Sequence, residues 1–147
     1  MKKFELTSEF ITNIFGTKLF RIKALIEFGN VKAGELGGFV EKEENLSQDG
    51  NAWVYGNARV CGNARVCGDA SVCGNAGYAT VHGFGSEYRT TTFFKTKAGD
   101  IGVKCGCFYG NLSEFRKKVV ETHGETKKAK EYLMLADLME FRFSDNS

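Results

Sequence analysis

Small apolar and polar positions alternate with a strict period of six in the middle of the chain. From residue 45 the sequence reads NLSQDG, NAWVYG, NARVCG, NARVCG, DASVCG and NAGYAT, which are six hexads without interruption. Alanine stands second and valine fourth in most hexads, so both have the same parity along a strand. A fixed six-residue period is typical of a parallel β-solenoid, in which each hexad forms one short strand and one corner.

The same period predicts which residues stack. With three faces to a turn, six hexads make two coils, and residues eighteen apart lie one above the other. We expect Val54 beneath Val72 and Ala52 beneath Ala70, with all four side chains inside. The Gly-Asn or Gly-Asp pairs supply corners that tolerate positive φ. Two coils at about 4.8 Å each make a stub about 10 Å tall, so both ends need caps.

The sequence before the repeat predicts the first cap. Phe20, Ile22 and Ala24 alternate with basic residues, which is the pattern of a half-buried strand. A glycine-rich stretch then turns the chain. Val40 stands six residues before Leu46, so we expect it to begin the inward column one hexad early.

The sequence after the repeat predicts a hairpin and two helices. Residues 90–97 and 101–108 flank an Ala-Gly-Asp turn as two strands. Asn111 is placed to cap the first helix, with Glu114 completing a capping box and Gly124 ending the helix. Thr126 is placed to cap the second helix. The expected apolar faces are Leu112, Phe115 and Val119, and then Ala129, Tyr132, Leu133, Ala136 and Met139.

Three stretches taken together resemble small phage- or prophage-encoded hexapeptide-repeat proteins, most of which have no assigned function. They are residues 34–45 before the repeat, the NAxVxG hexads, and Cys105-Gly-Cys-Phe-Tyr-Gly110 ahead of the Glu121-Thr-His-Gly124 helix end. The resemblance covers nearly the whole chain. It implies a left-handed β-helix, and it offers no settled catalytic residues.

Pattern and resemblance together predict a mainly β protein with α+β flanks. Its centre is a short two-coil left-handed parallel β-solenoid of about six hexads. We expect an N-terminal α+β cap at 1–44, the solenoid at 45–81 and a C-terminal ββαα cap at 82–147.

Composition and charge narrow the function classes. The 147 residues are 42% hydrophobic and 26% charged, as in a folded protein. The start of the chain shows no secretory signal, and an odd number of cysteines, five, favours reduced thiols. We therefore expect a protein of the bacterial cytoplasm without a membrane segment. The net charge of +2 is spread thinly, so nucleic acid is not expected as a direct ligand.

The two histidines do not form an obvious catalytic set. Acyltransferases that resemble such a solenoid use a histidine base, but residues 45–80 contain no histidine. His82 follows the last coil, so it could act as a base only if a partner subunit completed the site. With only His123 besides, one subunit cannot supply a three-histidine zinc site.

The cysteines show no metal-binding pattern either. Cys61, Cys67 and Cys73 are six residues apart and are expected on three different faces, so they cannot converge on one metal. Cys105 and Cys107 share parity with neighbouring apolar residues, and we expect both to face the hairpin core. We therefore predict no catalytic residue, cofactor or metal.

Outward positions of the repeat carry residue types that are enriched at protein interfaces. Trp53 and Tyr55 flank the inward Val54, while Arg59 and Arg65 project from the other two faces. These four residues are the candidate protein-binding site. The alternative is that the flanks of the chain itself cover Trp53 and Tyr55.

The sequence therefore favours a non-enzymatic interaction protein of phage origin. We expect it to bind a host bacterial protein, with inhibition of a host defence system such as CRISPR-Cas as the candidate activity. The phage and defence elements come from the resemblance alone. One alternative is a structural β-solenoid protein that associates with itself as a homodimer or a longer assembly. Another is an acyltransferase-like enzyme with a site at a subunit interface.

Overall fold

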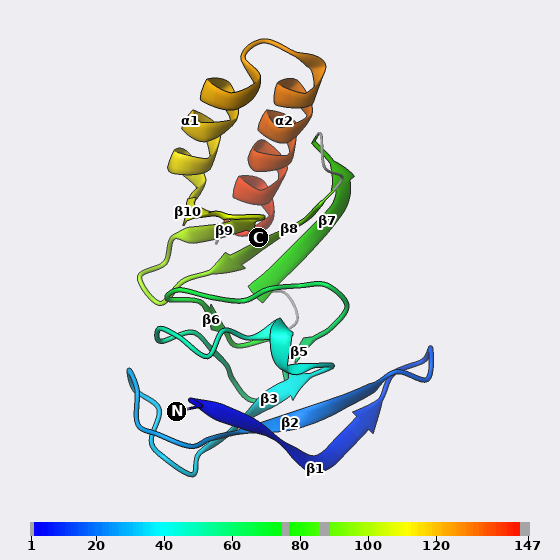
Figure 1. Cartoon of the computed structure of the whole chain (residues 1–147), viewed down its shortest axis with the longest axis vertical. Helices are drawn as coiled ribbons and strands as arrows, with labels where there is room; N and C mark the ends of the chain where they lie inside the picture. Colours follow the sequence, from blue (N-terminus) through cyan, green and yellow to red (C-terminus); the bar gives the residue numbers. More distant parts are fainter. Residues whose placement is uncertain (1, 75–76, 86–88, 145–147) are drawn as a thin grey trace.

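The first strands of the chain form a mixed four-stranded sheet. A computed structural model describes residues 2–74, 77–85 and 89–144. The strands of this sheet are β1 (Phe4–Thr12), β2 (Lys18–Ala24), β3 (Leu36–Val40) and β5 (Arg59–Val60), in the order β1-β2-β3-β5. The first three are antiparallel to one another, and β3 is parallel to β5. Figure 1 shows this sheet at one end of the molecule, and β2 is the predicted half-buried strand.

The repeat forms three very short strands. Besides β5, these are β4 (Trp53–Val54) and β6 (Ser71–Val72), which pair in parallel as a separate two-stranded sheet. Val54 lies opposite Val72, as the eighteen-residue spacing predicts. The second and fourth positions of the hexads are buried, namely Ala52, Ala58, Ala64 and Ala70, and Val54, Val60, Val66 and Val72.

The predicted two-coil left-handed parallel β-solenoid is wrong. The described residues form three sheets that are antiparallel, mixed or only two strands wide, and none of them is a solenoid. The repeat strands are two residues long and are divided between two sheets, because β5 joins the longer strands of the N-terminal sheet. Val40 pairs with Val60 and Leu46 with Val66, so these partners are twenty residues apart instead of eighteen.

The predicted caps also need correction. In the described residues before Leu46 there is one 3-10 turn, η1 (Glu43–Asn45), and no α-helix, so the α+β character expected there is wrong. The C-terminal part has four strands before its helices, where a ββαα segment was predicted. The first of these strands begins at Tyr78, inside the last predicted hexad, where the chain leaves the repeat for an antiparallel pairing.

The C-terminal sheet is antiparallel throughout. Its strands are β7 (Tyr78–Phe84), β8 (Arg89–Lys95), β9 (Ile101–Cys105) and β10 (Phe108–Asn111), in the order β10-β9-β8-β7. The pairing of β8 with β9 confirms the predicted hairpin.

Two helices follow as predicted, α1 (Leu112–His123) and α2 (Lys127–Arg142). The Asn111 side chain accepts from the backbone N–H of Glu114 at 2.8 Å, and the Glu114 carboxylate accepts from the N–H of Asn111 at 2.9 Å. The Thr126 hydroxyl caps α2 by accepting from the N–H of Ala129 at 3.3 Å. The expected apolar faces are buried, except that Leu133 is only half-buried.

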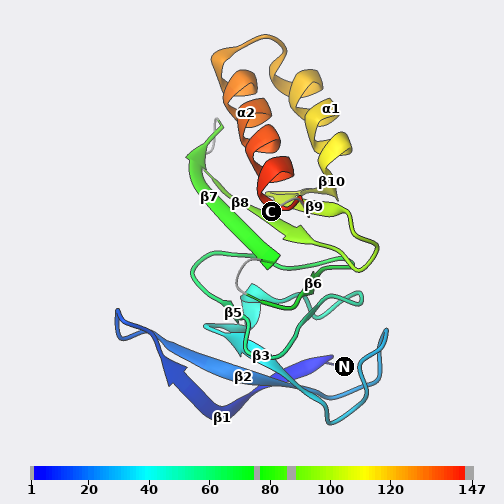
Figure 2. The same cartoon turned by 180° about the vertical axis from the view of Figure 1, so that it is seen from behind.

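β8 lies between two hydrophobic cores. Phe94 belongs to the core that the N-terminal sheet shares with the repeat, whereas Phe93 belongs to the core beneath the two helices. Because successive side chains of a strand point to opposite faces, the C-terminal sheet separates the helices from the repeat. Figure 2 shows this stacking from behind, with the helices, the sheet and the repeat following one another along the long axis.

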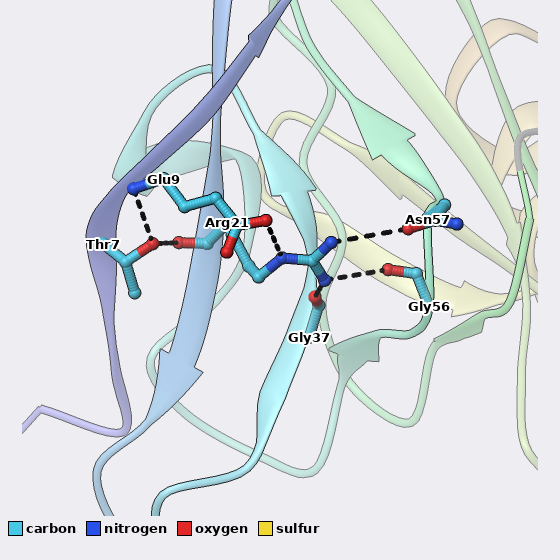
Figure 3. A network of polar contacts seen from close by, with 6 residues as sticks. All are labelled: Thr7, Glu9, Arg21, Gly37, Gly56 and Asn57. Carbon is cyan, nitrogen blue, oxygen red and sulfur yellow. Dashed lines mark hydrogen bonds and ion pairs between the residues drawn. The ribbon is translucent and has the colours of Figure 1, made fainter.

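Arg21 joins the N-terminal sheet to the repeat (Figure 3). From β2 its Nε donates to the Glu9 carboxylate at 2.8 Å, and one terminal nitrogen donates to the Gly37 carbonyl at 2.7 Å. The other terminal nitrogen reaches Asn57 in the repeat at 3.4 Å. The guanidinium also lies 4.3 Å from the centre of the Phe39 ring, so one side chain connects three strands and a corner.

Candidate functional site

The turn between β1 and β2 is held by one asparagine. The Asn13 side-chain oxygen accepts from the backbone N–H groups of Phe15 at 2.9 Å and Thr17 at 3.0 Å. Its backbone oxygen accepts from the N–H of Gly16 at 3.0 Å, where φ is +83°. An asparagine that bonds its own following backbone is a common means of fixing a tight turn. These bonds within the turn hold its backbone in one conformation.

This turn exposes two large apolar side chains. Ile14 is 93% exposed and Phe15 is 86% exposed, more than the other large apolar residues of the described chain. Figure 1 shows the turn extending sideways beyond the repeat. Behind it, the Phe10 and Phe20 rings lie 5.9 Å apart and brace the two strands. We call Ile14 and Phe15 the hairpin tip.

The outer side of α2 carries a second exposed apolar set. Met134, Leu138 and Phe141 are 71%, 53% and 79% exposed. Their spacings of four and three place them along one side of the helix. We call these three residues the α2 stripe.

Both sets were missed in the sequence analysis, although signals for each were present. The residues of the α2 stripe recur with helical spacing, as the residues of the buried face of the same helix do. The tip is a pair of apolar residues between an asparagine and a glycine, where a turn is normally polar.

Trp53 lies in the core and not at a surface. It is 0% exposed, and its ring meets the edges of the Phe4 and Phe28 rings at centroid distances of 6.2 and 5.2 Å. Its Nε1 has no hydrogen-bond partner within the part of the chain that the structure describes. For Trp53 the alternative is therefore confirmed, because the N-terminal segment covers it.

The four predicted binding residues do not form one exposed patch, because Trp53 is buried while Tyr55, Arg59 and Arg65 differ in exposure. Tyr55 is half-buried, and burial, with smaller effects of Cys73 and Glu35, raises the pKa of its phenol. Arg59 and Arg65 are exposed on different parts of the repeat. Binding of a partner by Tyr55, Arg59 and Arg65 stays a prediction.

The histidines lie in different surroundings. His82 is exposed on β7, where its Nδ1 is 2.9 Å from the Thr90 hydroxyl of β8. His123 stacks on Tyr132 at 6.0 Å between ring centroids. Each is therefore engaged in a local side-chain contact.

The three cysteines of the repeat differ in exposure. Cys61 and Cys67 are half-buried and Cys73 is exposed. Burial raises the pKa of the Cys67 thiol, which makes it a poorer nucleophile at neutral pH.

The two later cysteines differ from each other. Cys105 is half-buried and packs against the core beneath the helices, as predicted. Cys107 is exposed, so the prediction that it faces the core is wrong, because the chain turns between β9 and β10 at this point. Across residues 2–74, 77–85 and 89–144, no three His, Cys, Asp or Glu side chains gather as a potential metal site.

A cleft of about 500 Å³ lies between the repeat and the β8–β9 turn. It receives residues from the loop after β2, from two hexads, from the β8–β9 turn and from β10. Tyr55 is the one predicted binding residue that lines it.

No model of a known protein family matches the chain. Over 62 residues it is 39% identical to an uncharacterized acetyltransferase, YdcK, of Escherichia coli strain K12. The match covers 37% of this chain and 19% of that protein, so the chain spans about a fifth of the length of this relative. Within the described residues, no helix combines the length and apolar character needed to cross a membrane.

Proposed function

We propose that this chain is a protein-binding protein whose anchor is the hairpin tip. The observation that carries the proposal is the 93% and 86% exposure of two adjacent large apolar side chains on an ordered turn. Full burial of such a side chain stabilises a complex by about 1.5–3 kcal/mol. Exposed apolar groups of this kind are typical of surfaces that a partner covers.

The order of the turn supports the proposal. Both hydrogen bonds to the Asn13 side chain are made within the turn itself, at 2.9 and 3.0 Å. A turn already held in one conformation loses little entropy when it binds, so more of its contact energy appears as affinity.

The chemistry of the tip indicates the kind of surface that it fits. The strands behind the tip carry charged side chains of both signs. The Lys18 amine lies 4.8 Å from the centre of the Phe10 ring, and the Glu9 carboxylate pairs with Arg21. A protruding apolar tip with mixed charges behind it fits an apolar pocket with a polar rim on a folded protein.

The proposed partner is a host bacterial protein. This part of the proposal is supported by the resemblance of residues 34–45 and the hexads to phage-encoded proteins. A component of a host defence system, such as CRISPR-Cas, is the candidate partner on the same ground.

Affinity capture from a bacterial lysate tests the proposal. The wild-type chain is expected to retain one partner at a stoichiometric ratio, and Phe15→Ser is expected to lose it. Val120→Ser removes a 52% exposed apolar side chain from α1 and is the matched control that keeps the partner. Capture of nothing, or capture that Phe15→Ser leaves unchanged, contradicts the proposal.

Self-association is a second candidate, favoured by the α2 stripe. Three exposed apolar side chains on one side of a helix can pair with the same set on a second copy around a two-fold axis. Sedimentation is then expected to show a dimer that Leu138→Lys converts to a monomer. A wild-type monomer at high concentration contradicts this candidate.

The acyltransferase-like alternative is supported by the partial identity with YdcK. It predicts that the protein hydrolyses acetyl-coenzyme A or transfers its acetyl group to an acceptor, and that His82→Ala abolishes this activity. Activity unchanged in His82→Ala removes His82 as the base.

A further inference from the structure

We propose that the cleft between the repeat and the β8–β9 turn binds an uncharged sugar unit. The proposal goes beyond protein binding and does not depend on it. The cleft measures about 500 Å³, within the range of about 300–1,000 Å³ that is usual for ligand sites. Its polar and aromatic lining includes Asn30, Asn51, Tyr55, Asp69, Asp100 and Tyr109.

Tyr109 supplies an ordered aromatic platform in the cleft. Its ring is stacked on Phe94 at 6.3 Å with 14° between the planes, yet Tyr109 remains 45% exposed. The two rings are nearly parallel with their centres offset, so Phe94 packs alongside the Tyr109 ring and leaves part of it exposed. An exposed aromatic ring held by such a neighbour offers an apolar surface on which the C–H face of a sugar can pack.

The other end of the ring is fixed against the repeat. The Tyr109 hydroxyl accepts from the backbone N–H of Asp69 at 3.4 Å. Gly68, with φ of +64°, allows this approach, because a Cβ at that position would collide with the hydroxyl. The platform is thus held by two separate parts of the chain.

Several polar side chains of the cleft are uncommitted. Within the described residues, no hydrogen bond or ion pair engages the side chains of Asn30, Asn51, Asp69 or Asp100. The two amides each offer donors and an acceptor, and the two carboxylates are acceptors. Sugar hydroxyls both donate and accept, so they can satisfy this combination.

The charge of the cleft argues for a ligand without phosphate. Asp69, Asp100 and Glu114 line it against one basic residue, Lys97, which leaves an excess of two negative charges. Glu114 also caps α1, so its carboxylate is held in place. Such a surface repels nucleotides and coenzyme A and accepts a neutral sugar.

Titration of the full chain with cellobiose, maltose and N,N′-diacetylchitobiose, followed by amide NMR, tests the inference. At least one disaccharide is expected to shift the side-chain amides of Asn30 and Asn51, with millimolar affinity. Tyr109→Leu is expected to weaken binding about tenfold or more. Tyr109→Phe keeps the ring but loses the bond to the Asp69 N–H, so it is expected to weaken binding less than Tyr109→Leu. Asp100→Ala, on an exposed turn, is expected to weaken binding severalfold without disturbing the platform.

Three results would overturn the inference. The first is that no amide resonance of the cleft shifts with any of the three disaccharides at about 50 mM. The second is that the shifted resonances lie outside the cleft. The third is that coenzyme A binds in the same cleft more tightly than the disaccharides do. None of these results depends on whether the hairpin tip captures a protein.

Discussion

Lys3 places an amine inside the N-terminal core. It is 1% exposed, and its Nζ donates to the Ala52 carbonyl at 2.8 Å and to the Gly50 carbonyl at 3.3 Å. The Nζ also lies 4.7 Å from the centre of the Phe28 ring. Burial lowers the pKa of Lys3 from 10.5 to about 8, although the Asp49 carboxylate acts in the opposite direction.

This lowered pKa predicts a pH dependence of stability. Between pH 8 and pH 10.5 the unfolded chain binds the Lys3 proton and the folded chain releases it, so the free energy of unfolding gains a contribution that grows with pH. Below pH 8 the amine is charged in both states, and this contribution is absent. Urea unfolding of wild type and Lys3→Met at several pH values measures it as a difference between the two proteins. A difference that is constant from pH 7.5 to pH 10.5 contradicts the prediction.

Arg21 is expected to stabilise the fold more than an ordinary charged residue. Its side chain is 18% exposed and donates to the Gly37 carbonyl at 2.7 Å, so Arg21→Met leaves that carbonyl without its charged donor. We expect a loss of about 2 kcal/mol in the free energy of unfolding. Lys23→Met, an exposed position of the same strand, is the control and is expected to change it by less than ~0.5 kcal/mol. Equal effects of the two substitutions in urea unfolding contradict this role of Arg21.

At the level of the elements, Gly37 and Gly38 allow β3 to pack directly against the repeat. A methyl group at Gly38 would lie 2.6 Å from the Ala58 carbonyl oxygen and 2.7 Å from a Val54 methyl group. The strand therefore approaches the repeat too closely for any side chain. This contact explains why β5 pairs with β3 and joins the N-terminal sheet.

Gly38→Ala is expected to lower the free energy of unfolding by about 2–3 kcal/mol, because the added methyl group overpacks this contact. Gly74→Ala is the control, since a methyl group there meets open space and φ is not in the left-handed region. We expect the control to stay within ~0.5 kcal/mol of wild type. The measurement is urea unfolding, and a Gly38→Ala protein as stable as wild type contradicts the close contact.

Elements that depend on local signals were predicted correctly from the sequence. The caps at Asn111 and Thr126 define where both helices begin, and the Ala-Gly-Asp turn marks the β8–β9 hairpin. Helix caps and tight turns use residues within a few positions of one another, so a linear pattern contains them.

The arrangement of the repeat depended on distant pairings, and there the prediction failed. The inward positions were correct, because parity alone determines them, as Val60 and Val66 show. The partner of each strand was not determined by parity. β5 pairs with a strand twenty residues earlier, and the chain after Val72 continues into an antiparallel strand. The six-residue period therefore could not predict which strands outside the repeat pair with the strands of the repeat.

In the candidate site, too, the sequence predicted local features but not the contacts between distant parts of the chain. Trp53 was predicted at an outward position of the repeat, but the sequence could not show that Phe4 and Phe28 would cover it. The hairpin tip was missed because its exposure follows from how far β1 and β2 extend beyond the repeat.

At the scale of the whole molecule, β8 connects the two cores through neighbouring residues. Phe93 faces the helices and Phe94 faces the repeat. The single tryptophan, Trp53, reports on the repeat core, and helical circular dichroism reports on α1 and α2. We expect urea unfolding followed by the two signals to have one shared midpoint, because loss of β8 removes part of both cores.

Phe94→Leu is expected to lower both midpoints together. Loss of tryptophan burial at a lower urea concentration than loss of helix would show that the two cores unfold independently, which contradicts this account.

Site-specific photo-crosslinking inside bacterial cells tests the proposed function most directly. A photoreactive phenylalanine analogue replaces Phe15 at the hairpin tip in one protein and Val120 on α1 in the other, both of them exposed positions. Binding through the hairpin tip predicts that position 15 crosslinks to one bacterial protein in high yield and that position 120 does not. Crosslinking to the same protein from both positions in equal yield, or from position 120 alone, would contradict binding through the hairpin tip.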